Sequence, residues 1–258
     1  MVDPRWEAHQ IGAQRCIGLD LKRSQYIDDF GAYDANASAT WRAGQIVNLN
    51  AAQEVILDAG TIAGDSPFGV AKFDKTTAPY ATVVGEYIQL NVLVPTALAH
   101  ANLFTAAGVA AGVRVATLPM TGTVYTEGGD YTVNYVNGTI ERVGGTTITD
   151  GEYVYVNYMY ALTAADINRE GRNFWLSNDD VTIQDNRITV ITGRATLFTS
   201  QYDPSETYAV NDVLYAGEQA TNLMGGYFTI AVTSGHVVGK VFQIPTADDP
   251  YLGVTFTG

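Results

Sequence analysis

The amino-acid sequence predicts a mainly β protein with antiparallel sandwich or barrel units, an inserted β-meander and an extended N-terminal arm. Two observations carry this prediction. From Trp41 onward, short apolar runs alternate with Gly, Asn and Asp at the close spacing that is typical of strands and tight turns. The 258 residues are also enough for one large β domain or two ordinary ones, each with its own apolar core.

Residues 1–40 are expected to form the arm, because they have no sustained hydrophobic period and carry charges of both signs. Two interpretations of this segment stay open. It is either a disordered or loosely docked terminus, or a segment that becomes ordered on a neighbouring subunit. In the second interpretation the candidate interface residues are Trp6, Ile11, Ile17, Leu19, Tyr26 and Phe30.

Residues 41–118 are expected to form a β unit with one short helix. Thr96 is a suitable N-cap for a helix that runs through Ala97–Ala107 and ends at Gly108. Extended runs bounded by turn residues predict the strands of this unit at Gln45–Leu49, Glu54–Leu57, Gly69–Phe73, Ala81–Val84 and Tyr87–Val94.

Residues 119–163 are expected to form the β-hairpin and meander. Asn137 and Gly138 both tolerate positive φ and lie between two extended runs, which predicts a two-residue turn that pairs Tyr135 with Ile140. A third strand is predicted at Glu152–Ala161. The tyrosines of these strands are interpreted as core or cross-strand residues in preference to a sugar-binding platform.

Residues 164–258 are expected to form a C-terminal β unit that could pack with residues 41–118. A weak internal similarity supports two related units around the insertion, since Ala43-Gly-Gln-Ile-Val resembles Val210-Asn-Asp-Val-Leu and each is followed by a Gly-containing apolar run. The strands are predicted at Val181–Ile183, Arg187–Ile191, Ala195–Phe198, Asp212–Tyr215, Tyr227–Val232, Val237–Ile244 and Tyr251–Phe256.

Composition limits the classes of partner. Charged residues are only 16% of the chain, below the roughly 25% usual for soluble domains, which suits a protein with extensive subunit contacts. The formal net charge of −13 disfavours nucleic acid, because a phosphate backbone would be repelled. The chain starts without a secretory or mitochondrial signal, and polar residues interrupt its longest apolar stretch, so no membrane partner is expected.

Residues that carry chemistry are few and scattered. The three histidines are far apart and Cys16 is the only cysteine, so neither a zinc site nor an internal disulfide is expected. No nucleophile elbow or phosphate-binding glycine motif is present. Calcium at Asn178–Asp180 or Asp185–Asn186 stays open because these segments are rich in oxygen ligands. We therefore expect no enzyme, no catalytic residue and no cofactor.

Two segments resemble structural proteins of tailed-bacteriophage particles. The hairpin Gly129-Asp-Tyr-Thr-Val-Asn-Tyr-Val-Asn-Gly-Thr-Ile, with Asp150-Gly-Glu-Tyr-Val-Tyr-Val-Asn-Tyr, looks like a module common to such proteins. The stretch Tyr208-Ala-Val-Asn-Asp-Val-Leu-Tyr, continuing to Leu252-Gly-Val, is similar to the small β domains of capsid-associated phage proteins. The resemblance covers about half the chain by pattern rather than by a diagnostic motif, and it transfers no functional residue.

This resemblance implies a capsid decoration (cement) protein. Such a protein would lie on the capsid surface of the virion after assembly in the host cytoplasm, and would bridge neighbouring capsid subunits. Its expected partners are the major capsid protein and further copies of itself, as a homo-oligomer. Two alternatives stay open: a phage tail tube, collar or baseplate component, and a carbohydrate-binding β module of a fibre with Trp41 and Trp175 in its groove.

Overall fold

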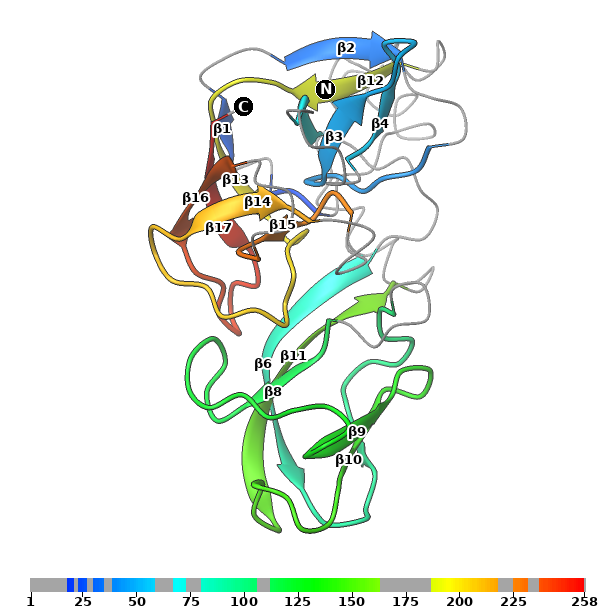
Figure 1. Ribbon diagram of the computed structural model, residues 1–258, viewed down its shortest axis with the longest axis vertical. Coiled ribbons are helices and arrows are strands. Elements are labelled where there is room, and N and C mark those ends of the chain that lie inside the picture. Colours follow the sequence, from blue (N-terminus) through cyan, green and yellow to red (C-terminus); the bar gives the residue numbers. More distant parts are fainter. Residues whose placement is uncertain are drawn as a thin grey trace, which may run out of the picture.

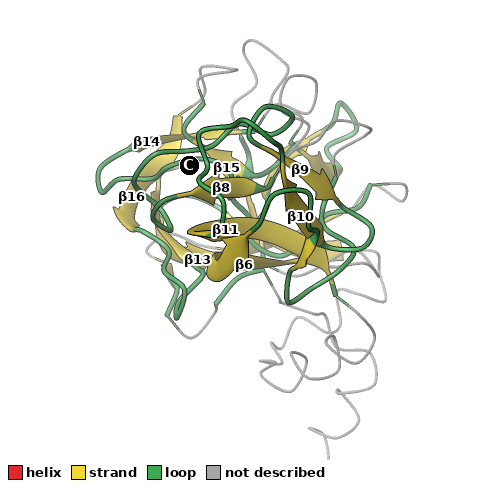
Figure 2. Ribbon diagram, turned by 90° about the horizontal axis from the view of Figure 1, so that it is seen from below, coloured by secondary structure: helices red, strands yellow, loops and turns green. Residues whose placement is uncertain are grey.

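The protein is built from antiparallel β-sheets. The computed structural model describes residues 18–20, 23–26, 30–34, 39–58, 67–72, 80–105, 112–162, 187–217, 225–231 and 237–257. Within these ranges there are seventeen strands in four sheets and no helix, which confirms the predicted mainly β fold. Figure 2, a view along the long axis of the molecule, shows the described part of the chain as strands joined by loops.

Two of the sheets have the same strand order. The N-terminal sheet contains β2 (Phe30–Asp34), β3 (Ile46–Leu49), β4 (Val55–Leu57), β5 (Gly69–Ala71) and β12 (Arg187–Ile191). The C-terminal sheet contains β13 (Ala195–Thr199), β14 (Val213–Ala216), β15 (Phe228–Thr229), β16 (Val237–Gln243) and β17 (Leu252–Phe256), with β1 (Gln25–Tyr26) added beside β13. Numbered along the chain within each sheet, both sets of five strands lie in the order first, fifth, fourth, second, third.

The equivalence extends to individual backbone hydrogen bonds. The amide of Gly44 donates to the carbonyl of Ala71 at 2.7 Å, and the amide of Asn211 donates to the carbonyl of Val241 at 2.8 Å. Gly44 and Asn211 both have positive φ, 86° and 75°, a conformation that Gly and Asn adopt more readily than other residues. The sequence similarity between the segments beginning at Ala43 and Val210 therefore corresponds to equivalent turns and strands.

Between β5 and β12 the chain forms a separate pair of three-stranded sheets, here called the inserted module. One sheet consists of β6 (Tyr80–Leu90), β11 (Glu152–Ala161) and β8 (Arg114–Ala116), and the other of β7 (Thr96–Ala97), β10 (Thr139–Arg142) and β9 (Tyr131–Asn134). Figure 1 shows β6 and β11 running from the two larger sheets to the far end of the elongated molecule. The insertion therefore includes β6 to β8, which the sequence analysis grouped with the first β unit.

The predicted turn at Asn137 and Gly138 is present, but its loop is longer than expected. Thr139 pairs with Asn134, so the loop has four residues, and Ile140 faces Val133 rather than Tyr135. Gly138 has a φ of 63°, whereas Asn137 is not among the residues with positive φ, so the two-residue primed turn does not form. A shift of two residues preserves side-chain faces, so Ile140 stays on the same side as Tyr131, and both belong to one buried cluster.

Two further predictions for this region need correction. The helix predicted at Ala97–Ala107 is wrong over the described residues 97–105, because β7 pairs with β10 and Leu103 bridges to Tyr160. The strand at Glu152–Ala161 has its predicted bounds but does not extend the hairpin into a meander. It pairs with β6 and β8 instead. Long-range packing of its apolar face selected these partners over the neighbouring hairpin.

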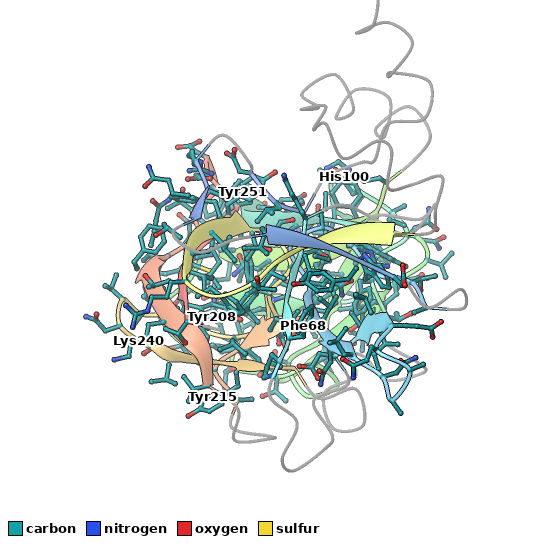
Figure 3. The ribbon with its side chains drawn as sticks, turned by 90° about the horizontal axis from the view of Figure 1, so that it is seen from above. Phe68, His100, Tyr208, Tyr215, Lys240 and Tyr251 are labelled. Carbon is teal, nitrogen blue, oxygen red and sulfur yellow. The ribbon has the colours of Figure 1, made fainter. Side chains whose placement is uncertain are left out.

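The larger sheets share one apolar core. A single buried cluster joins Ile46 and Val70 of the N-terminal sheet to Leu214 and Val254 of the C-terminal sheet, and Val84 of β6 also belongs to it. Residues of the two β units are thus packed together. A second cluster forms the core of the inserted module. Tyr208, labelled in Figure 3, lies in the shared core with 1% of its surface exposed.

Candidate interaction surface

The predicted N-terminal interface residues are only partly described. Leu19 is 2% exposed, forms a bridge with Thr199 and belongs to the shared core, so it is not an anchor for a neighbouring subunit. Tyr26 lies in β1 opposite Ala195, and Phe30 lies in β2 opposite Ile191. The prediction of an extended arm is therefore wrong for β1 and β2, because these two strands belong to the larger sheets. Trp6, Ile11 and Ile17 lie outside the described residues.

The sugar-binding hypothesis had placed Trp41 in an exposed groove. Trp41 is instead 1% exposed and packs in the core of the N-terminal sheet, because the turn before β3 directs it inward. Its equivalent in the second unit, Tyr208, is also buried. Trp175 and the candidate calcium segments lie outside the described residues. Among the residues described, no three His, Cys, Asp or Glu side chains gather where they could hold a metal ion.

The neighbouring carboxyl groups of the buried Asp203 and the partly buried Glu206 are the strongest candidate for chemistry. Burial raises the pKa of Asp203 and of Glu206, and the nearby Asp203 charge raises that of Glu206 further. Sequence reasoning missed these residues because Asp203 looked like a turn residue beside Pro204. Their contacts, however, are made within the chain.

The Glu206 carboxylate is fully occupied by four donors. It accepts the hydroxyl of Thr229 at 2.5 Å and of Tyr208 at 3.0 Å, and the amides of Ile230 at 2.7 Å and Ala231 at 3.1 Å. A carboxylate offers about four acceptor positions, so none is left for a substrate. These hydrogen bonds hold the loop between β13 and β14 against the end of β15, and this suits a structural role.

The tyrosines divide into buried and exposed sets. Tyr131 and Tyr158 are at most 2% exposed, which confirms their predicted place in the core. Tyr87 and Tyr153 are 57% and 52% exposed, and Tyr153 stacks on Tyr87 of the neighbouring strand, which is the cross-strand arrangement also expected for the tyrosines of β11. These two tyrosines are exposed because of their position along β6 and β11. The outer side of β11 is covered at Asn157 and Met159, but it is not covered near the start of the strand at Tyr153.

The exposed Tyr87 and Tyr153 and the partly buried Tyr155 form one surface, here called the tyrosine face. Tyr155 lies opposite Tyr87 on one side and opposite Ala116 on the other, and Ala116 bridges to Val124. Directly opposite residues point to the same side of a sheet. Ala116 itself is fully buried, so this row is exposed at Tyr87 and, separately, at Val124, which is 48% exposed.

A β-bulge places Tyr87 on this side of the sheet. The register between β6 and β11 shifts between Val156 and Tyr158, beside Gly85, whose φ is 72°. The Gly85 amide donates to the side chain of Asn157 at 2.8 Å. One extra residue reverses the two sides of a strand, so Tyr87 faces outward while Val83, before the bulge, packs against the module core.

The rings of the tyrosine face stack on one another. The Tyr87 ring centre lies 4.9 Å from that of Tyr153, with an interplanar angle of 19°, and 4.8 Å from that of Tyr155, with an angle of 38°. Tyr87 therefore presents its edge and hydroxyl rather than a free ring face. A sugar packs on a free ring face, so this geometry favours contact with a protein surface.

No helix in the described part of the chain is long and apolar enough to span a membrane. No family model, no curated protein and no solved structure matches the chain.

Proposed function

We propose that the protein is a structural component of a tailed-phage particle that binds the outside of the capsid and bridges neighbouring capsid subunits. The observation that carries this proposal is the tyrosine face, a stacked aromatic surface with more than half of Tyr87 and Tyr153 exposed. Exposed aromatic surfaces of this kind are typical of protein interfaces. The phage context comes from the sequence resemblance of the hairpin and the C-terminal stretch.

The mechanism is binding free energy rather than chemistry. A protein that binds only the assembled shell shifts the equilibrium away from loss of capsid subunits, by the same linkage that lets a ligand stabilise a folded protein. Bridging two identical neighbours requires two binding surfaces on one molecule. The duplicated strand order of the N- and C-terminal sheets supports this arrangement, because one chain then carries two related units. Symmetry repeats each contact over the shell.

The experiment adds the purified protein to capsid shells assembled from the major capsid protein of the same phage. We expect saturable binding to the outer surface, seen by electron microscopy, and a rise in the temperature at which the shells release subunits. Shells with and without the protein that break at the same temperature would contradict the decoration function, even if some protein binds.

The length of the inserted module favours a second candidate, a tail tube, collar or baseplate component. In that function the module would contact the next subunit along the tail. Particles produced without the protein distinguish the two candidates. Unstable heads with intact tails support the capsid function, and absent or shortened tails on stable heads support the tail function.

A further inference from the structure

The inserted module carries surface charge of one sign. Over its described residues, 80–105 and 112–162, Arg114 and Arg142 are the arginine and lysine side chains, and they are 1% and 8% exposed. The guanidinium of Arg142 donates to the carbonyl of Ile148 at 2.6 Å, inside the module. None of the acidic residues over the same ranges is buried: Glu86, Glu127, Asp130, Glu141, Asp150 and Glu152.

Asp150 lies close to one end of the tyrosine face along the chain, and its carboxylate accepts the amide of Val92 at 2.7 Å. Asp150 is exposed and lies in the turn that leads into β11, three residues before Tyr153. The same turn is joined to the face by Gln89, whose side chain donates to the carbonyl of Gly151 at 2.8 Å and which lies opposite Tyr153. The end of the face at Tyr153 is therefore flanked by a carboxylate.

Two further carboxylates are held in the ionised form. Hydrogen bonds from the amide of Thr149 and the hydroxyl of Tyr125 lower the pKa of Glu152. Hydrogen bonds from the amide of Thr126 and the side chain of Thr147 lower that of Asp130. These two groups therefore keep their negative charge to a lower pH than an unperturbed carboxyl group, although neither is part of the tyrosine face.

An arginine side chain matches this surface. Its planar guanidinium can donate to the tyrosine hydroxyls that the face presents and pair at the same time with the carboxylate of Asp150. A second copy of the same surface does not match, because acidic rims would meet each other. The same negative charge repels phosphate groups of nucleic acid or lipid.

We propose that the tyrosine face is a docking surface for an arginine-bearing basic patch on a partner protein. This inference rests on the proposed function only for the identity of the partner, which is then the capsid subunit. Tyr87 and Tyr153 supply the contact area, and Asp150 supplies charge complementarity.

The first test is independent of any phage particle. Tetra-arginine and tetra-lysine peptides are titrated against the full chain while the ring resonances of Tyr87 and Tyr153 are followed by NMR. We expect tetra-arginine to shift these resonances more than tetra-lysine, because a guanidinium offers five donors in a fixed plane to hydroxyl and carboxylate groups, whereas an ammonium is a point charge. The absence of any shift with tetra-arginine overturns the proposal. Shifts that depend on protein concentration alone also overturn it, since they identify a second copy as the occupant.

The second test uses the capsid shells and three variants. We expect the double variant Tyr87→Ser with Tyr153→Ser to bind at least tenfold more weakly, and Asp150→Asn to bind more weakly with a smaller dependence on salt. Val237→Ser is the matched control, because Val237 is 49% exposed on β16 and lies outside the module. Circular dichroism shows whether each variant folds.

The outcomes of the two proposals differ. If the unchanged protein does not bind shells, the capsid function fails and the peptide titration still decides the docking surface. If the unchanged protein binds shells and the double tyrosine variant binds equally well, the capsid function stands and the docking surface is wrong.

Discussion

At the residue scale, Arg114 shows how a buried charge can be held without a carboxylate. It is 1% exposed, and its guanidinium donates to the carbonyls of Leu118, Pro119 and Thr121 and to the hydroxyl of Thr207. Burial lowers its pKa, but a guanidinium stays charged in proteins. The side chain orders the loop after β8 and joins the inserted module to the C-terminal unit.

Replacement of Arg114 by Met should therefore be strongly destabilising. The change keeps much of the side-chain volume but leaves buried carbonyl groups without donors, and we expect a loss of roughly 2–5 kcal/mol in the free energy of unfolding. Urea denaturation measures it. The control is Lys240→Met on the exposed side of β16, for which we expect a change within about 0.5 kcal/mol. Equal effects of the two substitutions would contradict the assigned role.

Two carboxyl groups with shifted pKa values, those of Asp203 and Asp249, make the stability of the fold depend on pH with opposite signs. Asp203 has a raised pKa in the folded protein, so its charge opposes folding. Its contribution is therefore favourable below its unfolded pKa of about 3.9 and is lost as the pH rises through the folded value. Asp249 behaves in the opposite way, because Arg23 lowers its pKa, and its contribution is lost as the pH falls.

Asp203→Asn isolates the first effect. The amide oxygen can still accept from the amide and hydroxyl of Ser205, as Asp203 Oδ1 does, but it carries no charge to bury. We expect the unfolding free energy of the variant, relative to that of the unchanged protein, to increase between pH 4 and pH 8. Denaturation curves at several pH values measure this difference. A difference that is constant with pH would show that Asp203 does not titrate in this range.

At the element scale, the two equivalent turns use different residues for the same backbone conformation. Gly44 and Asn211 both have positive φ and lie two residues before the second strand of each unit. Gly44 has no room for a side chain, since a Cβ atom would lie 2.4 Å from Thr199 Oγ1, whereas Asn211 is exposed. The turn geometry is therefore common to both units, but tolerance of substitution is not.

Substitution of Asn211 tests this comparison. Asn211→Gly should change the unfolding free energy by less than about 1 kcal/mol, because glycine adopts this φ without strain. Asn211→Val should cost about 1–3 kcal/mol, because a β-branched residue is strained at positive φ. Thermal denaturation of the two variants provides the measurement. If valine is tolerated as well as glycine, the turn does not require this conformation.

At the scale of the whole molecule, the arrangement of cores predicts which parts unfold together. Ile46 belongs to the cluster shared by the two larger sheets, whereas Ile140 belongs to the cluster of the inserted module. Both side chains are fully buried. A disturbance at Ile46 should therefore reach both sheets, and one at Ile140 should stay within the module.

Hydrogen exchange of two alanine variants measures this coupling. We expect Ile46→Ala and Ile140→Ala each to cost roughly 2–5 kcal/mol. Ile46→Ala should speed exchange in both β3 and β14, although these strands belong to different sheets. Ile140→Ala should speed exchange in β9 to β11 and leave β14 unchanged. Faster exchange confined to β3 in the first variant would mean that the sheets are stabilised independently.

Much of the strand pattern could be predicted locally. The bounds of β11 and β12 agree with the prediction, and those of β13 and β17 differ by one residue, because apolar runs and turn residues act within a few positions of each other. The candidate surface could not be predicted in the same way. Tyr153 and Tyr158 occur in one strand with similar neighbours, yet one is 52% exposed and the other fully buried.

The sequence by itself determined the β class, the positions of most strands and the similarity of the two units, since backbone propensity and side-chain alternation are local properties. Only the tertiary structure decided that β11 pairs with β6 and β8, that a bulge at Gly85 turns Tyr87 outward, and that the outer side of β11 stays uncovered at Tyr153 and Tyr155. These outcomes depend on contacts between residues far apart in the chain, whose free energies no local pattern contains.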